Sequence, residues 1–426
     1  MILTDYLGSL LQVCSAASLL AAAVLAVRAC FAPGAPALEI PLAQPRRALL
    51  WCAAVAIGSR AALALIAWAL RSQLGPEYST GFEATWSQWD GPHYLDIARY
   101  GYTSDKSVNG GEQHWFIVFY PLYPALIALL KWLPGAEITA ATLISWGCLV
   151  GACYVIYRLA EMDHGPDEGR RAVRYLLVFP AAVFLGAAYT ESLFLLLSAA
   201  CLYAMRRGRW ALAGATGLLA ALTRNVGVLL AVPFLVELLD QLGALRQPGL
   251  LRTKDFWRAF VRRAPWVVLF PLGLAIYLLI NYIAYGDPLM FLQIQKEHWS
   301  QQMQPFWQTV LTTFRCALAG SGQPDSTRAF LWIPQLVGMI ALLAALPALT
   351  RRLRASMACY LVVYVLVMLS PSWLLSFHRY AMGAVPLLLA LAAVTRKRWV
   401  DLVLTCLMLL MMFYLFVGYV MGQMVV

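Results

Sequence analysis

Long apolar runs, separated by short basic clusters, constrain this chain more than any other feature of its sequence. Of its 426 residues, 62% are hydrophobic and only 12% are charged, whereas soluble domains carry about 25% charged residues. A helix of about 20 apolar residues spans the hydrocarbon core of a bilayer. The chain is therefore predicted to be an all-α polytopic membrane protein, and soluble, disordered and collagen-like classes are excluded.

The basic clusters predict the topology, because cytoplasmic loops of membrane proteins carry an excess of Lys and Arg. They also account for the net charge of +11, so nucleic acid is not an expected partner. The clusters are Arg46–Arg47, Arg206–Arg207–Arg209, Arg246 through Arg263, Arg351–Arg352–Arg354 and Arg396–Lys397–Arg398. Between them we expect twelve helices, to within one or two, with both termini outside the cytoplasm. These helices are 9–28, 49–70, 116–133, 137–159, 177–205, 210–223, 225–240, 265–285, 330–349, 356–370, 378–395 and 399–421.

Two long loops are predicted to lie outside the cytoplasm within what is otherwise one membrane domain, 1–426. The first, 71–115, is rich in carboxylates, and the second, 286–329, is rich in aromatic residues and Gln. Loops of this length usually carry a function. The simpler interpretation of the first loop is an acidic, solvated connection.

The first loop contains a pattern typical of a short helix at the membrane surface. Asp90 has the character of an N-cap, and Gly101 that of a helix end. His93 is then expected beside Asp90, with Tyr94 in the same aromatic surroundings. A carboxylate in this position is suited to act as a general base, but it is equally suited to be only a helix cap. Both interpretations stay open on these residues alone.

Other ionisable residues interrupt the apolar runs, where charge is costly and is commonly functional. Glu191 lies in one run, Arg224 in another, and His378-Arg379-Tyr380 at the outer start of a third. Arg224 is placed towards the outer leaflet, where a guanidinium can bind a lipid phosphate. The simpler alternative is a structural ion pair between Glu191 and Arg224.

Two further charges have simple structural explanations. Asp96 and Arg99 are three residues apart and can form an ion pair on one helix face. Arg60, alone in the second predicted helix, is expected to contact an acidic neighbour.

The motifs around these residues resemble those of the PIG-V family, which supplies the second mannosyltransferase of GPI-anchor assembly and has bacterial relatives. The segment WDGPHYLDIARYGY (89–102) resembles WD..HFL.IA..GY of that family. FYPLYP (119–124) is similar to FFP.FP, and PAAVFLGAAYTESLF (180–194) to P..VFL..YSE.LF. Arg224-Asn225 and Arg379-Tyr380 follow in the matching order.

This resemblance implies a GT-C glycosyltransferase fold, with about 11–13 transmembrane helices and short interfacial helices in the first outer loop. It also implies an inverting transfer of mannose from polyprenyl or dolichyl phosphate to an acceptor hydroxyl outside the cytoplasm, without a metal or other cofactor. Asp90 is then the expected base, with Arg224 and Arg379 at the donor phosphate. The expected supporting residues are His93, Tyr94, Asp96, Tyr189, Glu191, Asn225, His378 and Tyr380.

The acceptor is left open as a glycan, a glycolipid or a protein hydroxyl, because bacteria make no GPI anchors and the chain has a bacterial, Ala/Leu/Arg-rich character. We expect a monomeric multi-pass protein, in the plasma membrane if bacterial and in the endoplasmic reticulum if eukaryotic. Two alternatives remain: a transporter or lipid flippase, and a glycan ligase or polymerase with a lipid-diphosphate donor.

Overall fold

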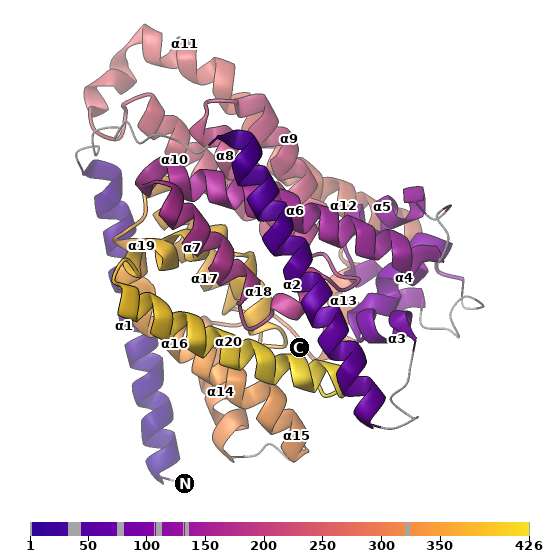
Figure 1. Ribbon diagram of the computed structural model, residues 1–426. Coiled ribbons are helices and arrows are strands. Elements are labelled where there is room, and N and C mark those ends of the chain that lie inside the picture. Colours follow the sequence, from indigo (N-terminus) through magenta and orange to yellow (C-terminus); the bar gives the residue numbers. More distant parts are fainter. Residues whose placement is uncertain are drawn as a thin grey trace.

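The computed structural model is a bundle of helices (Figure 1), described for residues 2–32, 44–74, 81–105, 107, 113–130, 132, 136–319 and 324–425. No β-strand forms in that part of the chain; Met303 and Pro371 make an isolated bridge. The α-helices are α1 (Ile2–Phe31), α2 (Pro45–Leu74), α3 (Phe82–Trp86), α4 (Asp90–Tyr100), α5 (Leu122–Leu130), α6 (Ala136–His164), α7 (Pro166–Leu177), α8 (Glu191–Arg206), α9 (Trp210–Ala221), α10 (Ala231–Gln241), α11 (Lys254–Arg263), α12 (Leu269–Tyr285), α13 (Met290–Trp299), α14 (Phe306–Ala319), α15 (Asp325–Thr327), α16 (Ile333–Thr350), α17 (Ala355–Met368), α18 (Phe377–Gly383), α19 (Val385–Val394) and α20 (Arg398–Val420). The short helices between them are η3 (Gln113–Val118), η4 (Ala182–Leu185), η5 (Asn225–Leu230), η6 (Pro248–Arg252), η7 (Ala264–Val268) and the π-helix η8 (Arg328–Trp332).

Within the described residues, six helical stretches are long and apolar enough to cross a membrane. A seventh is obtained if α18 and α19, which meet at 78°, are counted as one span. The six are Tyr6–Phe31, Pro45–Gln73, Glu137–Asp163, Lys254–Tyr285, Asp325–Thr350 and Arg398–Val420.

Several other predicted spans are not continuous α-helices, which corrects the expectation of twelve regular crossings. The range 116–133 divides into η3 and the nine-residue α5, and 225–240 opens with η5. The range 177–205 becomes α-helical only from Glu191 onwards, and 378–395 bends between α18 and α19. Hydropathy cannot locate such breaks, because it counts apolar residues without showing where tertiary contacts replace the helical hydrogen bonds.

The irregular backbone between α7 and α8 receives its hydrogen bonds from distant parts of the chain. Ser145 Oγ donates to the carbonyl of Ala187 over 3.0 Å, and the backbone N–H of Ala188 donates to Trp86 over 2.8 Å. The Arg60 guanidinium donates to the carbonyl of Ala182, so the expected acidic partner of Arg60 is replaced by a backbone oxygen. Irregular backbone in a membrane protein is tolerated where the protein buries it and supplies its hydrogen bonds. Ala182, Ala187 and Ala188 are fully buried, and the three contacts supply these bonds.

The two predicted outer loops lie against each other. Helix α4 packs on α5 and η3, while α13 packs on η3 from the second loop. The rings of Trp115 and His298 are 5.0 Å apart, and Tyr285 Oη donates to the carbonyl of Thr103 over 2.8 Å. Parts of these loops, 75–80, 106, 108–112 and 320–323, lie outside the described residues.

Candidate active site

Asp90 is the first residue of α4, and the residue before it sets its direction. Trp89 occupies the cap position with φ 50°, a conformation uncommon for a bulky residue. Its ring is held against Tyr419, with centroids 5.2 Å apart. The N-cap is therefore Trp89 and not Asp90 as predicted, which leaves the Asp90 carboxylate available for other contacts. Gly101, at φ 73°, ends the helix as expected.

Tyr189 fixes the backbone on which Asp90 sits. Its hydroxyl donates to the carbonyl of Gln88 over 2.6 Å and accepts from the backbone N–H of Asp90 at 3.2 Å. The ring is fully buried, so this contact anchors the start of α4 to the irregular segment before α8.

Four ionisable side chains from separate parts of the chain meet in one continuous network. Arg379 donates from Nη1 to Oδ2 of Asp90 over 3.0 Å, and from Nε to Oε1 of Glu191 over 2.6 Å. Arg224 donates from Nη1 to the same Oε1 of Glu191 over 2.8 Å. Two carboxylates are thus joined to two guanidiniums, and the formal charges of the network cancel.

Only the Asp90 end of this network is open to its surroundings. The side chain of Asp90 is 28% exposed, whereas those of Glu191 and Arg379 are 1% and 6% exposed. Buried charges require partners, because desolvation is costly. Oε2 of Glu191 is buried and has no hydrogen-bond partner among the described residues, so this carboxylate retains an unused acceptor.

Aromatic rings complete the surroundings of the two guanidiniums. The guanidinium carbon of Arg224 lies 4.4 Å from the ring centre of Tyr380. That of Arg379 lies 4.5 Å from the ring of Tyr189 and 5.0 Å from Phe184. These distances are within the range of cation–π attraction, so the rings keep both cations oriented towards Glu191.

The remaining predicted site residues lie at different distances from this network. Tyr94 is buried against Tyr189, with ring centroids 6.3 Å apart. His93 packs its ring 5.1 Å from that of Phe119. His378 is buried, and its Nε2 lies 3.0 Å from the carbonyl oxygen of Pro334. His378 therefore faces away from Glu191, although it adjoins Arg379 in sequence.

Two expected residues lie outside the network. Asn225 is exposed, and its Oδ1 accepts from the backbone N–H of Val226 over 2.8 Å. The predicted pair between Asp96 and Arg99 does not form, because Arg99 donates twice to Glu137, over 3.2 and 2.9 Å. Burial instead raises the pKa of the Asp96 carboxyl, and this effect outweighs the nearby charge of Arg99.

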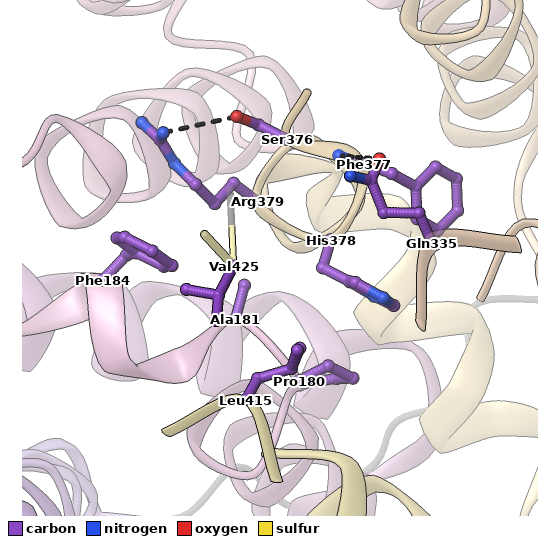
Figure 2. Close-up of a pocket in the computed structure, with 10 residues that line it drawn as sticks. All are labelled: Pro180, Ala181, Phe184, Gln335, Ser376, Phe377, His378, Arg379, Leu415 and Val425. Atoms are coloured by element: carbon purple, nitrogen blue, oxygen red, sulfur yellow. Dashed lines mark hydrogen bonds between the residues drawn. The ribbon is translucent and has the colours of Figure 1, made fainter. Parts of the chain in front are cut away.

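A small cavity adjoins Arg379 on the side of α18 (Figure 2). Its volume is about 10 Å³, which is room for one water molecule. Figure 2 shows the Arg379 guanidinium directed towards Ser376, whose Oγ accepts from Nη1 at 3.4 Å. Ser376 and Gln88 were not among the predicted site residues, because neither side chain is ionisable.

A comparison with family models finds the same relationship as the motifs. Residues 55–247 match the model Mannosyltransferase (PIG-V). The resemblance to PIG-V mannosyltransferases is therefore confirmed over this segment, which contains Asp90, Tyr189, Glu191 and Arg224. Arg379 lies beyond it.

Curated relatives agree with this PIG-V match. The chain is 49% identical over 100 residues to "GPI mannosyltransferase 2" of Yarrowia lipolytica, which covers 24% of this chain and 28% of that protein. It is 30% identical over 162 residues to "GPI alpha-1,6-mannosyltransferase 2" of Rattus norvegicus, with 35% and 31% covered. The chain thus spans less than a third of the length of these relatives.

A solved structure extends the likeness to the fold. ArnT from Cupriavidus metallidurans, crystallised with undecaprenyl phosphate bound, superposes with a TM-score of 0.50 at 16% identity. The match covers 83% of this chain and 62% of ArnT. The GT-C fold predicted from the sequence is therefore confirmed.

Proposed function

We propose that this protein is an integral-membrane mannosyltransferase that uses a polyprenyl-phosphate mannose donor. The PIG-V match supports the reaction class, and the likeness to an ArnT structure holding undecaprenyl phosphate supports the donor class. The observation that carries the proposal is the network in which a partly exposed carboxylate, Asp90, is joined through Arg379 to the buried pair of Glu191 and Arg224.

Asp90 is the general base of this proposal. The acceptor hydroxyl attacks C1 of the mannose, its proton passes to the Asp90 carboxylate, and the bond between C1 and the phosphate oxygen breaks. A lipid phosphate leaves as a stable anion, so the reaction needs no general acid. One displacement inverts the anomeric centre, which converts a β-linked donor into an α-mannoside.

Arg379 and Arg224 are the groups suited to bind the donor phosphate. Both are cations that Glu191 holds in place, so the folded protein orients them before the donor binds, as electrostatic preorganisation requires. Arg379 also holds the Asp90 carboxylate at 3.0 Å. A phosphate that attracts Arg379 would loosen this contact and leave the Asp90 oxygens free to accept the hydroxyl proton, so donor binding and base activation are coupled.

The cavity next to Arg379 has room for about one water molecule. A mannosyl phosphate therefore needs the walls of the site to move when the donor enters. The bend between α18 and α19, five residues beyond Arg379, is the place where we propose that this movement occurs.

We assign the site to the extracytoplasmic side of a multi-pass membrane protein. We also propose that the protein acts as a monomer, since one chain supplies all four charged residues. The acceptor is a hydroxyl on a glycan, a glycolipid or a protein. His93, Tyr94 and Asp96, on the same helix as Asp90, are proposed to support acceptor binding.

The decisive experiment compares purified Asp90→Asn and Asp90→Ala with wild type. Polyprenyl-phosphate mannose serves as donor, and native membrane lipids supply acceptors. Loss of a general base predicts a fall in transfer of about 10²- to 10⁴-fold. Asp105→Asn is the matched control, because Asp105 is an exposed carboxylate of the same loop. It is expected to be dispensable for mannose transfer. Wild-type transfer by both Asp90 variants would remove the catalytic assignment.

Two further outcomes distinguish the alternative functions. Activity with a lipid-diphosphate donor, but not with the monophosphate, would identify a ligase or polymerase. Counterflow of labelled lipid in proteoliposomes without sugar transfer would identify a flippase.

A further inference from the structure

Helix α11 presents two unlike faces and is remote from the candidate active site. Helical geometry places Phe256, Trp257, Phe260 and Val261 along one side. The basic residues Lys254, Arg258 and Arg262 lie along the other. The helix begins at a cap formed by Thr253, whose Oγ1 accepts from the backbone N–H of Phe256 over 3.3 Å.

The apolar side is only partly covered by the protein. Phe256 is buried, but Trp257 is 51% and Val261 63% exposed. The indole Nε1 of Trp257 donates to the carbonyl of Leu251 over 2.9 Å, so the ring is held at the surface. Trp is the residue most typical of the boundary between acyl chains and headgroups.

The basic side is not neutralised by the protein. The segment 246–263 contains six basic residues and one acidic residue, Asp255. Arg246 pairs with Asp240 at 2.8 Å. In the part of the chain that the structure describes, the basic residues of α11 itself form no ion pair with a carboxylate, so their charge is directed outwards.

The position of α11 fits a helix at the membrane surface. It continues through η7 into α12, and this helical stretch, Lys254–Tyr285, has 32 residues. About 20 residues are enough to cross the hydrocarbon core, so α11 extends beyond the core at one end of the span. The far end of α12 contacts the first loop through Tyr285 and Thr103. The 17 residues of α12 extend about 25 Å, so α11 lies a span's length from that loop, as Figure 1 shows with α11 and α4 far apart.

We propose that α11 lies in the membrane interface and binds anionic phospholipid headgroups, with Trp257 and Val261 inserted among the acyl chains and Arg258 and Arg262 at the phosphates. Amphipathic helices with basic polar faces bind anionic lipid in this way. The proposal is independent of the sugar-transfer function.

The test uses the full-length protein in vesicles of phosphatidylcholine and phosphatidylglycerol, with bromine on the acyl chains of one lipid at a time. Bromine quenches Trp fluorescence on contact. The chain has 15 Trp residues, so the signal of Trp257 is taken as the difference between wild type and Trp257→Phe. We expect quenching of Trp257 by both lipids, and more by brominated phosphatidylglycerol at equal mole fraction.

The same difference is then measured in an Arg258→Gln/Arg262→Gln background. Each basic residue near an anionic surface strengthens association about fivefold, so the preference for phosphatidylglycerol should fall by about 25-fold. Arg207→Gln/Arg209→Gln removes the same charge from the exposed connection between α8 and α9 and should leave the preference unchanged.

Three results would overturn the proposal. Absence of quenching would place Trp257 outside the lipid and favour a protein partner. Equal quenching by the two lipids would exclude a headgroup preference. An equal loss of preference in the control variant would show that total charge, and not α11, determines lipid association.

Discussion

Arg379 donates a hydrogen bond to Asp90 over 3.0 Å, although 289 positions of sequence separate the two residues. The contact joins the first loop to the helix near the C-terminal end, so neither part can move without affecting the other. Three predictions follow from it and from its neighbours, and two more concern other carboxylates of the first outer loop.

Tyr189→Phe tests whether the start of α4 must be held in place. The variant loses the hydroxyl that contacts both Gln88 and Asp90. We expect the free energy of unfolding to fall by about 1–3 kcal/mol, and mannose transfer to fall by about tenfold or more because Asp90 is displaced. Transfer rates and thermal unfolding in detergent measure the two effects. Tyr360→Phe is the control, since the buried Tyr360 hydroxyl has no hydrogen-bond partner among the described residues. Equal losses in both variants would contradict the role of Tyr189.

Glu191→Gln tests whether Glu191 holds both guanidiniums. Removing its charge leaves two buried cations without their shared partner, and breaking a buried pair costs about 3–5 kcal/mol. Adding Arg224→Met removes one of these cations, so the double variant should unfold at a higher temperature than Glu191→Gln alone. Thermal unfolding of the two variants decides this. Strictly additive losses would mean that Glu191 and Arg224 act separately.

Arg224→Met tests the proposed binding site for the donor phosphate. A hydrogen bond to a charged group contributes about 1.5–3 kcal/mol, so affinity for polyprenyl phosphate should fall by about 10- to 150-fold. Arg224→Lys keeps the charge without the planar fork and should give an intermediate value. Binding is measured by titration of the purified protein. Arg99→Met, which disrupts an arginine paired with Glu137 in the first loop, should bind like wild type; unchanged affinity in Arg224→Met would exclude the phosphate role.

Asp96→Asn tests the effect of burial on an acid of α4. Because burial raises the pKa of Asp96 above its ordinary value of 3.8, its ionised form destabilises the folded state. The variant should therefore unfold at a higher temperature than wild type near pH 7. The difference should shrink as the pH falls through the raised pKa and vanish below 3.8.

Asp105→Asn is expected to change the stability of the protein in the opposite direction. Hydrogen bonds from the backbone and hydroxyl of Ser107 lower the pKa of Asp105, so this variant should be less stable than wild type at neutral pH. That deficit should also disappear in acid, as the wild-type carboxylate takes up its proton. Thermal unfolding of both variants is measured across the pH range. A change of stability in the same direction for both variants would contradict the opposite pKa shifts of Asp96 and Asp105.

Local sequence patterns predicted much of the architecture. The short helix from Asp90 to Gly101 follows from turn and cap residues, apart from a shift of one position at its start. The simple pairing of Glu191 with Arg224 is present, and both residues could be named because charge is rare in apolar runs. The overall fold followed from the motif resemblance, which the comparisons confirm.

Long-range contacts explain what the sequence did not predict. Arg379 is shared between Asp90 and Glu191, and it lies in α18, which a bend separates from α19. Hydropathy carries no signal for either feature. The range 177–205 was predicted to be one helix, because most of its residues are apolar. The donors that stabilise its irregular first half, such as Arg60 and Ser145, come from other helices.

Those donors have a consequence for how the protein is made. The backbone from Ala182 to Ala187 depends on side chains of α2 and α6, and both helices are synthesised before it. A nascent chain that enters the bilayer in order therefore carries the required donors in place when this segment arrives. Moving either helix behind the segment by circular permutation would expose unsatisfied carbonyls to lipid and should direct the product towards degradation.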